Sequence, residues 1–139
     1  MSYDVRVTAH DRYLRIEARG TRSREASEAF FRRIAEESKA RGLYDILLVL
    51  ELEGRLSTFD IDDMVTKYRE AGFDSRHTIA VVDKNTESRP DTRFAEDVGY
   101  VRGLKGAAFD SEEEALRWLL ERRKDSESSP QDPNGPKIE

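Results

Sequence analysis

Polar side chains that could bind or transform a ligand follow two apolar stretches of the chain, 46–50 and 78–82. If these stretches are parallel strands, their carboxyl ends meet at one edge of the sheet, where open α/β sheets bind ligands. We predict that any ligand site lies there, with Asp110 as a further neighbour. The predicted ligand-binding residues are Glu53, Arg55, Ser57, Thr58, Asp83 and Asn85. The alternative interpretation is that they only form turns and helix caps.

Acidic residues in the same region do not complete a metal motif. The segment 60–63 holds three Asp residues at the start of a predicted helix, where the helix dipole favours acids, but no His or further carboxylate stands at ligand spacing. The segment 83–87 begins like a calcium loop, yet Ser88 replaces the required Gly and Phe94 the closing Glu. We therefore predict no metal site.

The sequence contains no recognisable pair of nucleophile and base. It has no Cys and two histidines, His10 and His77, which we expect at the surface or at a strand edge. It also lacks the glycine motifs that bind nucleotide phosphates. We predict that the protein is not an enzyme and holds no cofactor.

The composition restricts the classes of partner. Charged residues make up 38% of the chain, but acids and bases are interleaved and the net charge is −5, so we expect no nucleic-acid surface. The longest apolar run, 46–50, is far shorter than the roughly 20 residues that cross a membrane. We expect a cytoplasmic protein without membrane insertion.

The first half of the chain predicts a hairpin, a helix and a buried strand. Apolar residues at every second position indicate strands over 5–9 and 14–18, which pair as a hairpin. Ser23 and Gly42 are typical of the two ends of a helix. The unbroken apolar run within 44–52 indicates a central parallel strand covered on both faces.

The second half continues the alternation of helices and strands. We expect helices over 57–71 and around 94–101, a strand over 78–82, and a last strand and helix within 105–124. This order predicts an α/β fold with a single mixed, mostly parallel five-stranded sheet, four helices on its two faces and the first strand as an antiparallel edge. We assign 1–124 to one domain and 125–139 to a disordered polar tail.

The stretch 105–120 is the most distinctive part of the chain. Asp110 is the expected N-cap of the last helix, with Glu113 as its capping-box partner. Ala115, Trp118 and Leu119 fall on one helix face. We therefore expect Trp118 to anchor this helix in the core.

These features resemble the STAS-like (SpoIIAA-like, STAS/SEC14) family of small bacterial proteins. The resemblance covers roughly residues 3–122 and rests on the strand sequences 44–50 and 79–83 and on the pattern Phe109-x5-Ala115-x2-Trp118-Leu119. It implies a SpoIIAA-like fold. Most members of the family have no assigned activity, so the resemblance implies no reaction.

One branch of the wider superfamily consists of anti-sigma-factor antagonists, which are switched by phosphorylation at the start of the helix after the central strand. The resemblance places Ser57 and Thr58 at that position as phosphorylation candidates, although 56–60 lacks the Asp-Ser-Ser/Thr-Gly pattern. The acids at 60–63 would oppose a phosphate group there. The alternative is that Ser57 or Thr58 caps the helix.

Three classes of function remain. The first is a non-catalytic interaction or regulatory module that binds a protein partner or a second copy of itself as a homodimer. The second is a carrier of a small apolar or lipid-like ligand in a pocket at the carboxyl ends of the parallel strands, and an enzyme comes third. Phe59, Met64, Tyr68 and Phe73 discriminate between the first two, because a cavity lined by them favours a ligand, whereas a closed core or an exposed patch favours a partner.

Overall fold

The computed structural model describes residues 2–128, and these form one sheet with the strand order β1-β2-β3-β4-β5. β1 pairs with β2 in antiparallel orientation, and the pairs from β2 to β5 are parallel. This arrangement confirms the predicted mixed sheet and its antiparallel first edge. The strands are β1 (Asp4–Ala9), β2 (Leu14–Thr21), β3 (Asp45–Glu53), β4 (Thr78–Asp83) and β5 (Lys105–Phe109).

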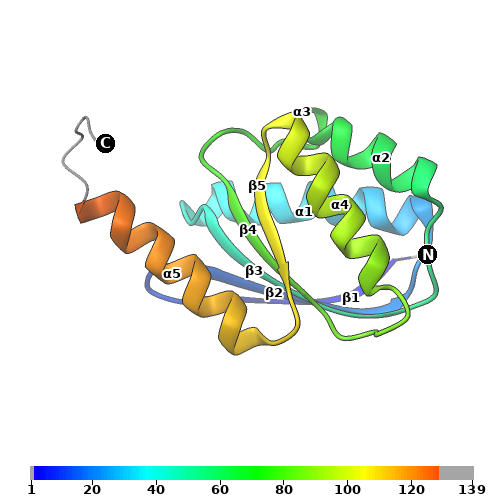
Figure 1. Cartoon of the computed structure of the whole chain (residues 1–139), viewed down its shortest axis with the longest axis horizontal. Helices are drawn as coiled ribbons and strands as arrows, with labels where there is room; N and C mark the ends of the chain where they lie inside the picture. Colours follow the sequence, from blue (N-terminus) through cyan, green and yellow to red (C-terminus); the bar gives the residue numbers. More distant parts are fainter. Residues whose placement is uncertain (1, 129–139) are drawn as a thin grey trace.

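Five helices accompany the sheet in the described residues, one more than predicted, because the helix expected over 57–71 is divided at Lys67. Beyond this bend Tyr68 buries its ring and donates a hydrogen bond to the Arg102 carbonyl at 3.2 Å. The helices are α1 (Arg24–Arg41), α2 (Thr58–Thr66), α3 (Tyr68–Ala71), α4 (Arg89–Arg102) and α5 (Glu112–Ser128). Figure 1 shows α2 and α4 beside each other, with α5 apart from them.

The ends of α1 follow the sequence signals. Ser23 accepts a hydrogen bond from the Ala26 N–H at 3.1 Å, which satisfies one of the free donors of the first turn. Gly42 ends the helix with φ 66°, a left-handed conformation that costs glycine little. These two residues set the length of α1 as predicted.

Most of the helices cover one face of the sheet. Consecutive parallel strands joined by right-handed crossovers place every crossover helix on the same side. On this side α1 packs Phe30 and Ile34 against alternate residues of the strands, such as Ile16 and Leu48. This larger core also receives Phe73, whose ring lies 4.5 Å from that of Phe31.

The other face is covered by α5, which follows the last strand and is free of the crossover rule. Leu47 and Val49 of β3 and Val82 of β4 pack there against Ala115 and Leu119. Since β3 is the middle strand and contributes side chains to both cores, its unbroken apolar run is explained.

One expectation for α5 was wrong, and a second is confirmed only in part. The N-cap is Ser111 rather than Asp110: the Ser111 hydroxyl accepts from the Glu114 N–H at 3.2 Å, whereas Asp110 pairs with Arg93. Trp118 is half-buried at the border of the smaller core, where its ring lies 5.4 Å from that of Phe109. The fully buried places on this helix face belong to Ala115 and Leu119.

Charged residues extend the contact of α5 with the sheet. Arg15 of β2 donates two hydrogen bonds to Glu112 at 3.1 and 3.0 Å. Lys84 lies 3.4 Å from both Glu112 and Glu51. Arg15 of β2 and Lys84, which follows β4, therefore bind the start of α5 through ion pairs.

The C-terminal end of the described chain is helical, because α5 continues to Ser128. The first four residues of the expected tail, 125–128, thus belong to this helix, and 129–139 lie outside the described residues. In the part that the structure describes, every helix is too short or too polar to cross a membrane.

Candidate functional site

An apolar cavity of about 210 Å³ lies between the sheet and the helices α1, α2 and α4. Aliphatic and aromatic side chains form most of its wall, among them Phe30 from α1, Leu48 from β3 and Met64 from α2. Small residues on β5 and α4 leave the space open: Gly106 and Ala108 on the strand, and Ala95 and Gly99 on the helix. An additional Cβ on Gly106 would meet the Ile79 carbonyl oxygen at 3.2 Å, so a larger residue cannot easily fill the cavity from that position.

The polar part of the cavity wall lies toward the carboxyl ends of the strands. Arg22 follows the end of β2, and Asp91 and Thr92 stand in the first turn of α4, after β4. Ser27 of α1, Glu96 of α4 and the hydroxyl group of Tyr3 are the other polar members. The cavity is therefore apolar over most of its wall, with its polar groups at the edge of the sheet where the sequence places the candidate residues.

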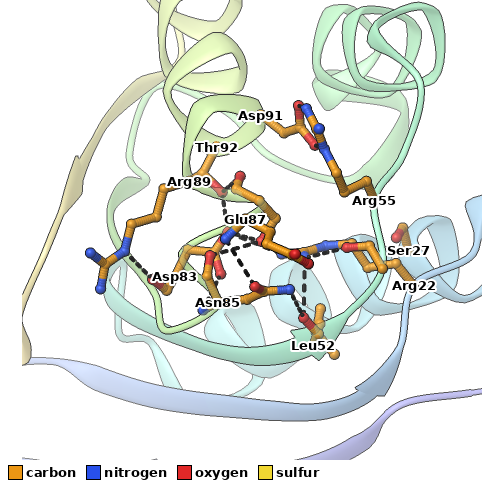
Figure 2. Close-up of polar contacts among 12 residues, drawn as sticks. Arg22, Ser27, Leu52, Arg55, Asp83, Asn85, Glu87, Arg89, Asp91 and Thr92 are labelled. Carbon is orange, nitrogen blue, oxygen red and sulfur yellow. Dashed lines mark hydrogen bonds and ion pairs between the residues drawn. The ribbon is translucent and has the colours of Figure 1, made fainter.

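Asp83 is the centre of the polar network at this edge (Figure 2). Its buried carboxylate accepts hydrogen bonds from the Ser88 hydroxyl at 2.6 Å, from the Thr92 hydroxyl at 2.7 Å and from Arg22 at 3.3 Å. The Asn85 N–H donates to its second oxygen at 3.0 Å. Both oxygens of the carboxylate thus accept hydrogen bonds within the protein, three on one oxygen and one on the other, and the network fixes the first turn of α4 next to the end of β4.

Arg22 joins this network to the end of β3. Its guanidinium donates to the carbonyl oxygens of Leu52 at 3.3 Å and Gly54 at 3.1 Å, and the Asn85 side chain donates to the same Leu52 carbonyl at 3.0 Å. The Arg22 side chain is only 9% exposed, so its charge is balanced by the buried Asp83 and not by solvent.

A second ion pair spans the space between α2 and α4. Arg55, just before α2, donates two hydrogen bonds to the Asp91 carboxylate, both at 2.8 Å (Figure 2). This pairing lowers the pKa of Asp91 from its ordinary value and raises that of Arg55. The bidentate geometry fixes the amino-terminal ends of the two helices relative to each other.

The predicted site residues fall into separate roles. Asp83 and Asn85 share the buried network, and Arg55 pairs with Asp91. Ser57 accepts a hydrogen bond from the Asp60 N–H at 3.0 Å, the contact of an N-cap, and Thr58 is the first residue of α2. Glu53 lies in a separate open depression with Asn85 and Glu87, outside the cavity wall. The structure therefore brings two of the six predicted residues, Asp83 and Asn85, into one hydrogen-bond network.

The sequence did not predict several residues of the cavity wall. Arg22 could have been found, because it follows a strand that is parallel to its neighbour β3 and so ends at the same edge. Asp91, Thr92 and Glu96 lie on α4. The small residues Ala95 and Gly99 on the same helix are the sequence feature that could have pointed to a cavity beside it. Small residues leave room beside a sheet, but the sequence does not show which helix lies over which strand.

The four discriminating residues separate into three environments. Met64 lines the cavity, and it does so beside Ile61 and Val65 of the same helix. Tyr68 and Phe73 pack in the closed core. Phe59 is 74% exposed. The region thus contributes both to a cavity and to an exposed surface.

His77 is fully buried, which contradicts its expected place at the surface or a strand edge. Its ring packs between Tyr44 and Phe73, and its Nδ1 accepts a hydrogen bond from the Asp74 N–H at 3.1 Å. This residue directly precedes β4, and the turn before the strand directs its ring into the protein. In the described residues His77 belongs to no group of three or more side chains that could hold a metal ion.

Comparisons with known proteins give a likeness of fold. No protein-family model and no curated protein matches the chain. Among solved structures it is similar to the crystal structure of an uncharacterized protein from the DUF3478 family with a SpoIIAA-like fold from Shewanella loihica PV-4. The similarity covers 85% of this chain and 94% of that chain, with 19% identity and a TM-score of 0.49.

Proposed function

We propose that the protein is a non-catalytic binding module that holds a small apolar ligand in the cavity between the sheet and α1, α2 and α4. The cavity itself is the observation that carries this proposal. Binding sites for small molecules are concave and mostly apolar, with a few polar groups that set orientation. The wall described above has this composition, and its polar groups lie at the edge where open α/β sheets bind ligands.

The rigidity of the cavity edge supports the proposal. The buried hydrogen bonds of Asp83 and the ion pair of Arg55 with Asp91 hold the surrounding loops and helix ends through contacts within the protein. A site that is already ordered loses little conformational entropy on binding, so a larger share of the contact energy contributes to affinity.

The size of the cavity limits the ligand. An apolar cavity of about 150 Å³ can hold benzene, with its six carbon atoms. By proportion, the cavity of about 210 Å³ accommodates roughly eight non-hydrogen atoms. The ligand is therefore a short alkyl or single-ring compound, or the end of a longer chain.

Native mass spectrometry of the purified protein, followed by calorimetry with 1-hexanol, tests the proposal. Ala108 shares its sheet face with Val81, because the two are paired in the parallel register and both line the cavity. The variant Ala108→Leu should fill the cavity and lose binding. The matched control Ala40→Leu, at an exposed position of α1, should bind as the wild type does.

Two outcomes would contradict the proposal. In the first, the wild type binds no apolar compound of this size and carries none from the cell. In the second, Ala108→Leu binds as well as the control variant, which would place the ligand outside the cavity.

A protein partner is the second candidate, supported by large apolar side chains at the surface. Tyr100 and Val101 are 83% and 77% exposed at the end of α4, and Phe59 is exposed at the start of α2. Light scattering of the wild type and of Tyr100→Ser tests self-association. A dimer that Tyr100→Ser dissociates supports a homodimer through this surface, and a monomer at all concentrations excludes it.

A further inference from the structure

We propose that the ligand carries a cationic end, a primary ammonium group, that pairs with Glu96 in the cavity wall. This inference rests on the proposed function and deepens it, because it states the chemical class of the ligand. It follows from the charges and hydrogen bonds of the polar residues that line the cavity.

The basic group in the wall is already neutralised. Arg22 is the one basic residue that the cavity lining contains in the described part of the chain. Its guanidinium pairs with the buried Asp83 and donates to the carbonyl oxygens of Leu52 and Gly54. Because the buried Asp83 carboxylate balances its charge, the wall offers no net positive charge to an anionic ligand.

Most of the other polar groups in the wall also have partners. The Asp91 carboxylate receives both hydrogen bonds of Arg55. The Thr92 hydroxyl donates to Asp83, and the Ser27 hydroxyl lies 2.6 Å from that of Tyr3. The carboxylate of Asp91 and the hydroxyl groups of Thr92, Ser27 and Tyr3 are therefore occupied by contacts within the protein.

Glu96 is the exception. It is half-buried on α4, one turn after Thr92, and its carboxylate forms no hydrogen bond or ion pair among the described residues. With Arg22 balanced by Asp83 and Asp91 by Arg55, Glu96 leaves one unbalanced negative charge in a mostly apolar wall. A carboxylate in such surroundings favours a cation, because a charge-assisted hydrogen bond is stronger where water is partly excluded.

An alkylammonium ion satisfies both parts of the site. Its apolar chain fills the space between the sheet and α4, and its ammonium group donates hydrogen bonds to Glu96. The cavity size estimated above fits hexylamine, which has seven non-hydrogen atoms. Hexylamine, 1-hexanol and hexanoate share one chain and differ in the charge of the end group, so they test the charge preference directly.

Calorimetric titration of the wild type with these three compounds at neutral pH is the experiment. We expect hexylamine to bind about tenfold more tightly than 1-hexanol, the ratio that corresponds to one hydrogen bond to a charged group, and hexanoate to bind most weakly. Glu96→Gln should remove the preference, so that the ratio of the hexylamine affinity to the 1-hexanol affinity falls to about one. Asp97→Asn changes the net charge equally at an exposed position of the same helix and should keep the preference.

The outcomes separate the two proposals. If 1-hexanol binds in the cavity but hexylamine binds no better, or if Glu96→Gln keeps the preference, the assignment of a cationic ligand is wrong and the cavity remains a binding site. If Asp97→Asn reduces the preference as much as Glu96→Gln, the net charge of the protein explains it and Glu96 does not. If none of the three compounds binds, the proposed function itself fails.

Discussion

Asp83 shows how a polar residue at a strand end can serve the fold. Sequence patterns place a carboxylate at this position, where either a ligand or a turn could use it. In the structure its side chain is 1% exposed and accepts hydrogen bonds from Arg22, Ser88, Thr92 and the Asn85 backbone. The residue therefore positions one edge of the cavity, and both of its carboxylate oxygens are engaged within the protein.

Replacing Asp83 with Ala should lower the free energy of unfolding by about 3 kcal/mol, because it leaves the buried Arg22 charge without its carboxylate. The carbonyl oxygens of Leu52 and Gly54 remain as partners, which keeps the loss at the lower end of the range for such pairs. Urea unfolding measures the change. The control Glu87→Ala alters an exposed acid in the same loop and should stay within about 0.5 kcal/mol of the wild type.

We expect His77 to make the free energy of unfolding depend on pH. Burial lowers the pKa of its imidazole below the ordinary value of 6.5, and Asp74 opposes this shift while Arg76 and Lys39 add to it. Nδ1 accepts a hydrogen bond from the Asp74 N–H and lies 3.4 Å from the Asp74 carbonyl oxygen, and Nε2 has no partner among the described residues. A second proton would convert Nδ1 into a donor and break that hydrogen bond.

The sign of the effect follows from linkage. The unfolded chain takes up the proton at a higher pH than the folded chain, so stability is complete above the unfolded pKa near 6.5 and falls as the pH drops toward the lower folded value. We expect the unfolding free energy of the wild type to fall more between about pH 8 and pH 6 than that of His77→Asn, which keeps an acceptor for the Asp74 N–H. Equal losses in the two proteins would show that His77 does not titrate on unfolding.

At the scale of elements, the sequence predicts those features that depend on local physics. Strand periodicity, the Ser23 cap and the glycine at position 42 are set by neighbouring residues, and the structure confirms them. The break at Lys67 between α2 and α3 carries no Pro or Gly and could not be read from the sequence. The choice between Asp110 and Ser111 as the cap depends on where β5 ends, which sequence patterns locate only to within a few residues.

The start of α5 gives a direct test of that cap. Ser111→Ala should lower the unfolding free energy by about 1 kcal/mol, the usual loss for an N-cap hydroxyl. Asp110→Ala should cost about half as much or less, since its pairing with Arg93 is exposed to solvent. Thermal or urea unfolding compares the two variants. A larger loss for Asp110→Ala would return the cap to the position that the sequence indicated.

For the whole molecule, the order of the strands decides where a ligand can lie. Because β2 to β5 are consecutive and parallel, α1, α2 and α4 share one face, and the cavity forms where these helices meet small residues of β5. The sequence could predict that the strand-end polar residues gather at the carboxyl edge of the sheet. It could not predict the cavity, because the cavity wall combines side chains from helices and strands that lie far apart in the chain.

Ala108→Leu tests this cavity through stability as well as through binding. If the space next to β5 is empty in the free protein, the added side chain fills it and should raise the unfolding free energy by about 1 kcal/mol. The wild type should gain stability on addition of 1-hexanol, in proportion to the logarithm of its concentration above the dissociation constant, and the variant should gain none. Urea unfolding with and without the alcohol measures both effects. A destabilised variant would mean that the side chains of α4 already occupy the space above Ala108, because overpacking a closed core costs about 1–3 kcal/mol.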